Sequence, residues 1–158
     1  MEKVFHTLEP IFDKNSKVLV LGSMPSPKSR EAGMYYSHPQ NRFWRVLAAV
    51  FEEQTPSTNE EKREFLLKHK IACWDVLASC DIQGASDSKI KNAVCNDFNV
   101  ITQTANIVKV FTTGKVAAKY YKAFTGKDSA CLPSTSPANC AVSFEELVDA
   151  YRAIRDFT

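Results

Sequence analysis

The sequence predicts an α/β protein, a three-layer α/β/α arrangement in which helices cover both faces of a central, mostly parallel four-stranded sheet. Short apolar runs alternate along the chain with segments whose apolar residues recur at helical spacing. The first run, residues 17–22 (KVLVLG), is rich in Val and Leu and ends at Gly22. Such a run is typical of a strand that is buried on both faces, which requires a layer of helices on each side.

One domain is expected over residues 1–158, because this length is close to the average of about 150 residues per domain. Hydrophobic residues at 44% and charged residues at 24% are typical of a globular domain. The aliphatic stretch 18–21 is far shorter than the roughly 20 residues that span a bilayer. The first 15 residues lack the apolar core of a secretory signal. We therefore expect no membrane partner and a location inside the cell, in the cytoplasm or, in a eukaryote, the nucleus.

Several kinds of chemistry have no support in the sequence. The five cysteines are an odd set without a C-x-x-C pair, which favours free, buried thiols over disulfides or a zinc ribbon. The five glycines cannot form a dinucleotide or phosphate loop, and the three histidines are widely separated, so no metal site is predicted. A formal net charge of +2 is compatible with an anionic partner without demonstrating one.

The first half of the chain contains the following elements after the first strand. A polar loop leads to a helix over about 39–51, where Pro39 is suited to a helix start and Phe43 and Leu47 begin an apolar stripe. A second helix covers about 60–69. The next strand is Ile71 to Ala78, and residues 83–96 form a polar excursion before a short helical pattern from Asp97.

The second half continues the alternation. A strand over 108–112 precedes a helix that opens at Gly114, and another strand lies near 130–133. The apolar face of that helix is expected to contain Ala117, Tyr120 and Phe124. The last helix starts with a capping box of Ser143 and Glu146. Its apolar stripe comprises Phe144, Leu147, Tyr151 and Ile154.

A ligand site is predicted at one edge of this sheet. In parallel sheets ligands bind beyond the carboxyl ends of the strands, so the loops after Gly22, Leu77 and Leu132 should converge. The first of these loops, residues 22–44, is dense in small, aromatic and amide residues that suit a base or a sugar-phosphate. The residues concerned are Gly22, Ser23, Ser26, Tyr35, Tyr36 and Asn41.

Five short motifs of this chain resemble those of the uracil-DNA glycosylase superfamily, above all its hypoxanthine-DNA (deoxyinosine) glycosylase branch. In chain order they are G-S-M-P-S from Gly22, Y-Y-S-H-P-Q-N-R-F-W at 35–44, W-D-V-L at 74–77, I-K-N at 90–92 and L-P-S-T-S-P-A-N at 132–139. Five motifs in order are far more specific than any one of them. The segment H-P-Q-N-R-F-W is also similar to that of the mismatch-specific uracil glycosylases.

The resemblance implies an enzyme that flips a deaminated base, hypoxanthine in deoxyinosine, out of DNA and hydrolyses its N-glycosidic bond. The product is an abasic site for base excision repair. The resemblance further implies that the enzyme needs no cofactor, acts on DNA containing deaminated bases and works as a monomer.

The resemblance also implies roles for individual residues. Asn41 takes the catalytic place, either orienting water through its carbonyl or bonding the substrate through its amide. Tyr36 stacks on the flipped base and Asn92 reads the base edge, in a pocket completed by Ser23, Met24 and Pro25. The expected DNA contacts are Ser26, Lys28, Arg30, Ser134, Thr135, Ser136 and Asn139.

Two departures from the family pattern bear on the substrate. Met24 replaces a polar residue that positions water in uracil-cleaving relatives, and Leu132 replaces one that hydrogen-bonds a base carbonyl. Both favour the hypoxanthine branch over the alternative of a uracil or G:U/G:T mismatch glycosylase. A non-catalytic nucleic-acid-binding module is the other alternative. Asp75 and Asp87 are interpreted as caps or ion-pair partners only.

Overall fold

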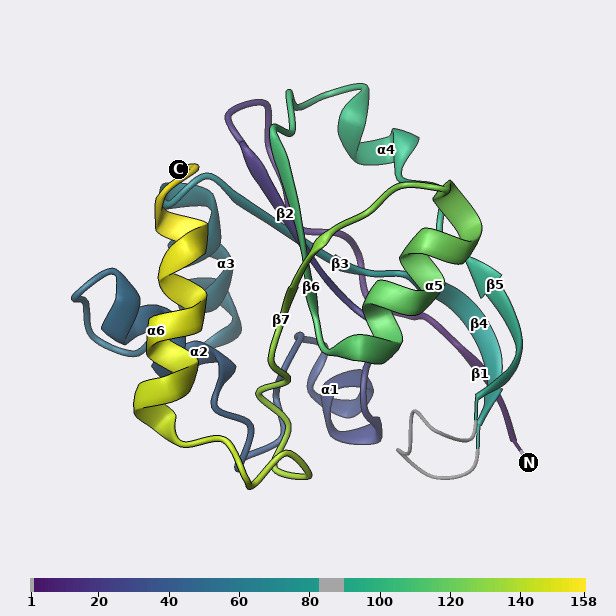
Figure 1. The fold of residues 1–158 in the computed structure, drawn as a ribbon, viewed down its shortest axis with the longest axis horizontal. Coiled ribbons are helices and arrows are strands. Elements are labelled where there is room, and N and C mark those ends of the chain that lie inside the picture. The colour runs from purple at the N-terminus through teal and green to yellow at the C-terminus, as the bar shows by residue number, and fades with distance from the viewer. Residues whose placement is uncertain (1, 83–89) are drawn as a thin grey trace.

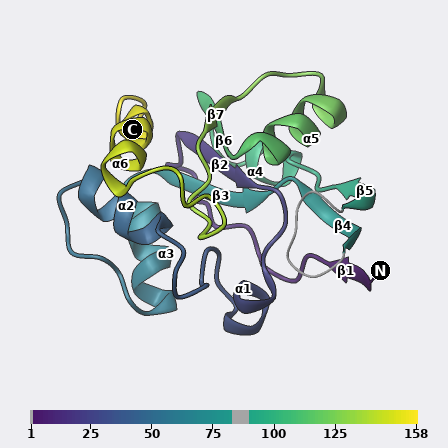
Figure 2. The same cartoon turned by 60° about the horizontal axis from the view of Figure 1, so that its bottom comes forward.

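The computed structural model describes residues 2–82 and 90–158 and has the predicted three layers. Its central sheet has the strand order β3-β2-β6-β7, and every pair in it is parallel. These strands are β2 (Val18–Gly22), β3 (Ile71–Asp75), β6 (Lys109–Thr113) and β7 (Ala130–Leu132). Helices α2 (Phe43–Val50), α3 (Asn59–Lys68) and α6 (Phe144–Arg155) lie on one side of this sheet and α5 (Lys115–Thr125) on the other (Figures 1 and 2).

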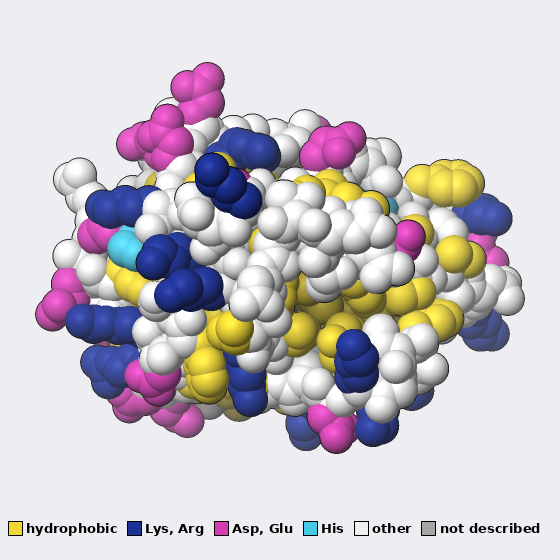
Figure 3. Space-filling view, turned by 90° about the horizontal axis from the view of Figure 1, so that it is seen from above, with side chains coloured by type: hydrophobic (Ala, Val, Ile, Leu, Met, Phe, Trp, Pro, Cys, Tyr) yellow, Lys and Arg dark blue, Asp and Glu magenta, His cyan; other side chains and the backbone are white. Residues whose placement is uncertain are grey.

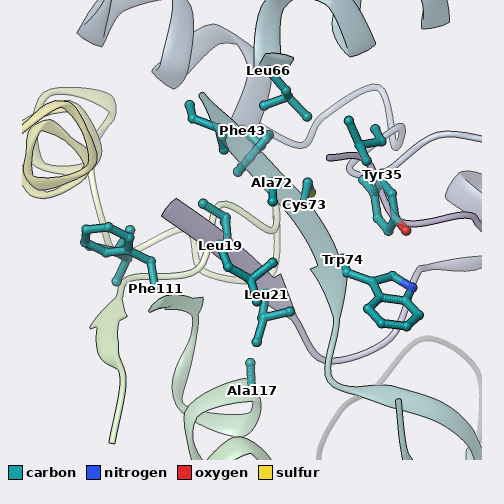
Figure 4. Packing of buried hydrophobic residues seen from close by; sticks show 14 of the residues in the cluster. Leu19, Leu21, Tyr35, Phe43, Leu66, Ala72, Cys73, Trp74, Phe111 and Ala117 are labelled. Atoms are coloured by element: carbon teal, nitrogen blue, oxygen red, sulfur yellow. The ribbon is translucent and has the colours of Figure 1, made fainter. Parts of the chain in front are cut away.

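Strand β2 occupies the middle of the core, as its apolar run predicts. All five of its residues are buried, because α2 and α3 cover one face and α5 the other. In Figure 4, Phe43 and Leu66 lie on one side of the sheet and Ala117 on the opposite side. The parallel register pairs Gly22 with Asp75, so the carboxyl ends of β2 and β3 meet at the same edge.

A second sheet, antiparallel and three-stranded, was not predicted. It has the order β1-β4-β5, formed by β1 (Glu2–Phe5), β4 (Leu77–Ile82) and β5 (Lys91–Cys95). The prediction of one strand over 71–78 is therefore wrong. The chain changes sheet at Val76, whose N–H donates to the Gly22 carbonyl of β2 at 2.8 Å and whose carbonyl accepts from the Asn96 N–H, just after β5, at 2.8 Å.

The polar excursion predicted over 83–96 contains strand β5 at its end. Residues 83–89, including Asp87, lie outside the described residues. The short helix expected from Asp97 is α4 (Asn99–Thr102), which connects β5 to β6.

The structure also corrects two helices near the first loop. Helix α2 begins at Phe43 rather than at Pro39, because the Asn41 side chain accepts from the Phe43 N–H at 2.9 Å and Gln40 N–H is bound by His38 Nδ1. Within the loop, α1 (Pro27–Ala32) was not predicted. Its signals are visible in hindsight, with Ser26 as N-cap, Pro27 at the first position and Gly33 at φ 72° after the last.

Helices α5 and α6 differ from prediction in which side chains face the core. In α5 the buried residues are Ala117 and Tyr121, whereas Phe124 is 45% exposed and stacks on Tyr120 at the surface. This correction reflects the narrow contact of α5 with β6 and β7, which buries one i, i+4 pair.

In α6 the capping box of Ser143 and Glu146 is confirmed. The predicted stripe is confirmed for Leu147, Tyr151 and Ile154, but Val148 is buried in place of the exposed Phe144.

Of the five cysteines, Cys73 and Cys80 are buried as expected, whereas Cys131 and Cys140 are exposed. Among the described residues, no helix is long and apolar enough to cross a membrane.

Candidate active site

A cavity of about 130 Å³ lies at the carboxyl edge of the parallel sheet, where the ligand site was predicted. Its walls come from the loops after β2 and β7, from the last residues of β3 and β6, and from Val4 of β1 and Ile82 of β4. The loop expected to contribute after Leu77 does not do so, because Leu77 already begins β4; Asp75 contributes in its place. The volume is well below the range of about 300 to 1,000 Å³ for drug-sized ligands, so the cavity suits one planar base rather than a whole nucleotide.

A wider hollow of about 810 Å³ lies near the opposite edge of the sheet, between α4 and α5. Figure 3 views the molecule from that side and shows exposed hydrophobic side chains there. The smaller cavity is the better candidate for chemistry, because it lies at the carboxyl ends of the parallel strands and is lined by Tyr36 and Asn41 of the first loop.

Hydrogen bonds hold the part of the first loop that contains Tyr35, the first of the two adjacent tyrosines. Trp44 Nε1–H donates to the Tyr35 carbonyl at 3.0 Å, and the Tyr35 hydroxyl donates to the Glu9 carbonyl at 2.8 Å. Ser29 Oγ accepts from the Ser37 N–H at 3.0 Å, which ties α1 to the same loop. Tyr35, which also lines the cavity, thus anchors the loop through its carbonyl and its hydroxyl.

Tyr36 presents a ring to the cavity. One face of the ring stacks on Phe43, with centroids 3.8 Å apart and planes at 17°, and the side chain lines the cavity. Its hydroxyl lies 3.0 Å from Thr113 Oγ1, and burial raises the pKa of Tyr36 well above its usual range, so the hydroxyl stays neutral. The backbone of Tyr36 has φ 54°, an uncommon conformation for an aromatic residue and one that clusters at functional sites.

Asn41 also lines the cavity, with its two side-chain atoms in different environments. Its Oδ1 accepts from the Phe43 N–H at 2.9 Å and from Thr135 Oγ1 at 2.8 Å. A flipped amide would set its own N–H groups against the Phe43 N–H, so this orientation is fixed. Nδ2 is therefore the atom of Asn41 that is suited to donate to a ligand.

The loop after β7 is fastened to the start of α2 by Arg42. The Arg42 N–H donates to the Thr135 carbonyl at 3.1 Å. Its guanidinium donates to the carbonyls of Val142 at 2.6 Å and Asn139 at 2.9 Å. Sequence reasoning gave Arg42 no role, although it adjoins Asn41 in the H-P-Q-N-R-F-W motif.

Most of the residues proposed from the sequence meet at this cavity. Those that line it are Ser23, Met24, Pro25, Ser26, Arg30, Tyr36, Asn41, Ser134, Thr135 and Ser136. Arg30 Nε is buried there without a hydrogen-bond partner among the described residues. Lys28 is exposed on α1 and is not among the lining residues.

Besides Lys28, two proposed residues, Asn92 and Asn139, do not line the cavity. Asn92 is exposed on β5, where its Nδ2 donates to Asp81 Oδ2 at 2.6 Å, so it does not face the cavity that it was expected to read. Asn139 donates from Nδ2 to the Ser134 carbonyl at 2.9 Å and so braces the loop from within.

Sequence reasoning missed three polar residues that line the cavity, namely Ser29, Asp75 and Thr113. Asp75 is 3% exposed and lies 2.8 Å from His6 Nε2 through Oδ2. Sequence reasoning did not place Asp75 at the carboxyl end of a strand, where ligand sites lie, because the strand was predicted to continue to Ala78. Among residues 2–82 and 90–158, no group of three or more His, Cys, Asp or Glu side chains could hold a metal ion.

These features define an α/β protein with a base-sized, polar pocket at the carboxyl edge of its sheet. Residues 9–155 match the family model of the Uracil DNA glycosylase superfamily, so the chain belongs to this superfamily.

Named relatives and a solved structure extend the comparison. The chain is 36% identical over 134 residues to a protein named hypoxanthine DNA glycosylase from Methanosarcina barkeri (strain Fusaro / DSM 804), covering 82% of this chain and 85% of the relative. It is 33% identical to a protein of the same name from Methanosarcina acetivorans, covering 82% and 84%. A solution NMR structure of a candidate uracil DNA glycosylase from M. acetivorans superposes with a TM-score of 0.78 at 29% identity, covering 94% of this chain and 97% of that one.

Proposed function

We propose that this protein is a DNA glycosylase that releases hypoxanthine from deoxyinosine in DNA by hydrolysing the N-glycosidic bond. The observation that carries the proposal is the pairing, in one base-sized cavity, of the Tyr36 ring with the amide of Asn41. Superfamily membership and relatives named hypoxanthine DNA glycosylase support the same activity.

The polar groups of the cavity match the charges of this reaction. Cleavage leaves positive charge on the sugar and negative charge on the departing base, so donors fixed toward the base or its water lower the barrier. Asn41 supplies such a donor through Nδ2, because Phe43 and Thr135 hold the rest of its amide. The exposed face of Tyr36 stacks on the base and holds it out of the helix.

The enzyme holds DNA through the loops around the cavity. Arg30 on the α1 side supplies a cation, and Ser134 and Ser136 on the opposite side supply hydroxyls suited to phosphate oxygens. Ser26, whose hydroxyl donates to Ser29 Oγ, lines the same cavity on the α1 side. Lys28 adds an exposed cation on α1. The enzyme acts as a monomer of one domain, without a cofactor, in the compartment that holds the DNA.

Hypoxanthine is preferred to uracil because two positions lack polar groups. Met24 lines the cavity with a thioether where a carboxylate or amide could orient water. Leu132 is 5% exposed at the end of β7 and packs into the core, so it offers no hydrogen bond to a base carbonyl.

A gel assay separates this function from its alternatives. Duplexes that carry hypoxanthine, uracil, xanthine or a G:T mismatch at one position are incubated with excess enzyme and then cleaved with alkali. Strand cleavage fastest at hypoxanthine is expected. Comparable rates at uracil or G:T would place the enzyme with the mismatch-specific relatives, and binding without cleavage would make it a non-catalytic module.

A further inference from the structure

Asp75 is the one carboxylate among the described residues that line the cavity, and it lies deep in it. Its side chain is 4% exposed, whereas Ser26, Arg30 and Ser136 are half-buried. Gly22 makes room for it, because a Cβ built on Gly22 would lie 2.4 Å from Asp75 Oδ1 and 3.1 Å from the Tyr36 hydroxyl oxygen. Oδ1 and this hydroxyl therefore converge above Gly22 at the floor of the cavity.

His6 fixes the other oxygen of this carboxylate from behind. Its Nε2 lies 2.8 Å from Asp75 Oδ2, and its side chain is 3% exposed and does not line the cavity. The backbone N–H of His6 donates to the Ala78 carbonyl at 2.8 Å, and the His6 ring packs edge-on against Trp74. With Oδ2 bound by His6, Oδ1 is the oxygen directed toward a ligand.

The floor of the cavity meets one particular edge of a flipped purine. The sugar stays with the DNA strand at the mouth, so the floor faces the edge farthest from N9, which carries N1 and the C6 substituent. Deamination changes this edge: adenine has an N1 acceptor and an amine, whereas hypoxanthine has an N1–H donor and a carbonyl. A carboxylate only accepts when ionised, so it pairs with N1–H and repels the adenine N1 lone pair.

We infer that Asp75 is the residue that selects the deaminated base, by accepting the N1–H of hypoxanthine through Oδ1, and that His6 is a positioning residue that holds this carboxylate. This inference rests on the proposed function. It also assigns to Asp75 the reading of the base edge that sequence reasoning gave to Asn92. Sites built around a substrate N–H reject analogues that lack it, because the buried acceptor is then left unpaired.

The test compares single-turnover excision of hypoxanthine and of unsubstituted purine, which lacks both N1–H and the carbonyl, from otherwise identical duplexes. Asp75→Leu is expected to lower the hypoxanthine rate by about 10², the scale of losing one preorganised contact. The purine rate should stay the same or rise, because purine N1 carries the lone pair that the carboxylate repels. A merely structural role would lower both rates in parallel. A parallel fall would therefore overturn the inference.

Two His6 variants keep the inference testable if Asp75→Leu does not fold. His6→Ala removes the ring Nε2–H that holds Asp75 Oδ2. We expect the ratio of the hypoxanthine rate to the purine rate to fall by about tenfold or more, which corresponds roughly to the loss of one hydrogen bond. His6→Gln retains an N–H at similar reach and should restore most of this ratio. The same ratio in the wild type and both variants would overturn the role of the pair. A wild-type enzyme that binds DNA but releases no hypoxanthine would instead overturn the proposed function and this inference together.

Discussion

The two polar atoms of the Asn41 side chain have different proposed roles. Oδ1 accepts hydrogen bonds from the Phe43 N–H and from Thr135 Oγ1, and we propose that Nδ2 donates to the substrate. Asn41→Ala should lower the single-turnover rate on deoxyinosine by about 10² or more, through loss of one preorganised donor. The accompanying loss of folding stability should not exceed about 2 kcal/mol, the range for a capping side chain. Single-turnover cleavage time courses measure the rate, and urea unfolding measures the folding stability.

Asn41→Asp is the matched control for this variant. An aspartate retains an oxygen that can accept from Phe43 N–H and Thr135, so stability should remain close to that of the wild type. It replaces the donating amide with an acceptor, so activity should still fall. Full activity in either folded variant would show that Asn41 serves only the start of α2.

Tyr36 is expected to act on retention of the flipped base. Tyr36→Ala should weaken binding of a duplex containing hypoxanthine by about 1 to 3 kcal/mol, the usual worth of a base–aromatic stack. Tyr36→Phe keeps the ring that packs on Phe43 and removes the hydroxyl bound to Thr113, so it should retain most of this affinity. Fluorescence anisotropy with a catalytically impaired Asn41 background measures the difference. Equal losses in both variants would contradict a stacking role.

The residues of the site differ in how far the sequence could identify them. Asn41 and Tyr36 lie in one continuous motif, so their local pattern was sufficient to locate them. Asp75 and His6 are 69 residues apart, and their contact forms only when β1 pairs with β4. Neither residue type in isolation distinguishes a buried ligand contact from a surface ion pair, so the pattern alone could not select them.

At the scale of elements, the start of α2 and the loop after β7 behave as one unit. Arg42 joins them through three hydrogen bonds to loop carbonyls, two of them from the charged guanidinium. Arg42→Ala should release residues 134–142, because hydrogen bonds from charged groups are worth about 1.5 to 3 kcal/mol. Faster amide hydrogen exchange in this loop and a lower cleavage rate are the expected results.

Arg42→Lys is the control for charge. A lysine keeps the positive charge but lacks the planar fork that reaches two carbonyls at once, so it should not restore protection from exchange. If Arg42→Ala left both exchange and cleavage unchanged, the loop would not depend on this anchor.

The elements were predictable where a local signal determines them. The run of β2 and the capping box of α6 each specify their element without distant contacts. The division of residues 71–82 into two strands was not predictable, because no Gly or Pro separates Asp75 from Leu77 and the change of sheet depends on the distant partners of Val76, Gly22 and Asn96. β1 was missed because four residues of mixed polarity become a strand only through pairing with β4.

At the scale of the whole molecule, we expect the enzyme to catalyse cleavage with its own side chains and water alone. The donors proposed for the departing base come from Asn41 and from hydroxyls, and no cluster of metal-ligand side chains occurs in the described parts of the chain. Cleavage of deoxyinosine DNA should therefore proceed at an unchanged rate in EDTA. Activity lost to the chelator and restored by Mg²⁺ or Zn²⁺ would contradict this assignment.

The most direct test of the central claim is mass-spectrometric measurement of the products formed from a deoxyinosine duplex by the wild type and by Asn41→Ala. Hydrolysis of the N-glycosidic bond predicts free hypoxanthine and abasic DNA in equal amounts, with the sugar-phosphate backbone intact before alkali. The Asn41→Ala protein should form both products about 10² times more slowly. Release of a deoxyinosine nucleotide, a nicked backbone, or wild-type amounts of free hypoxanthine from the variant would contradict the account.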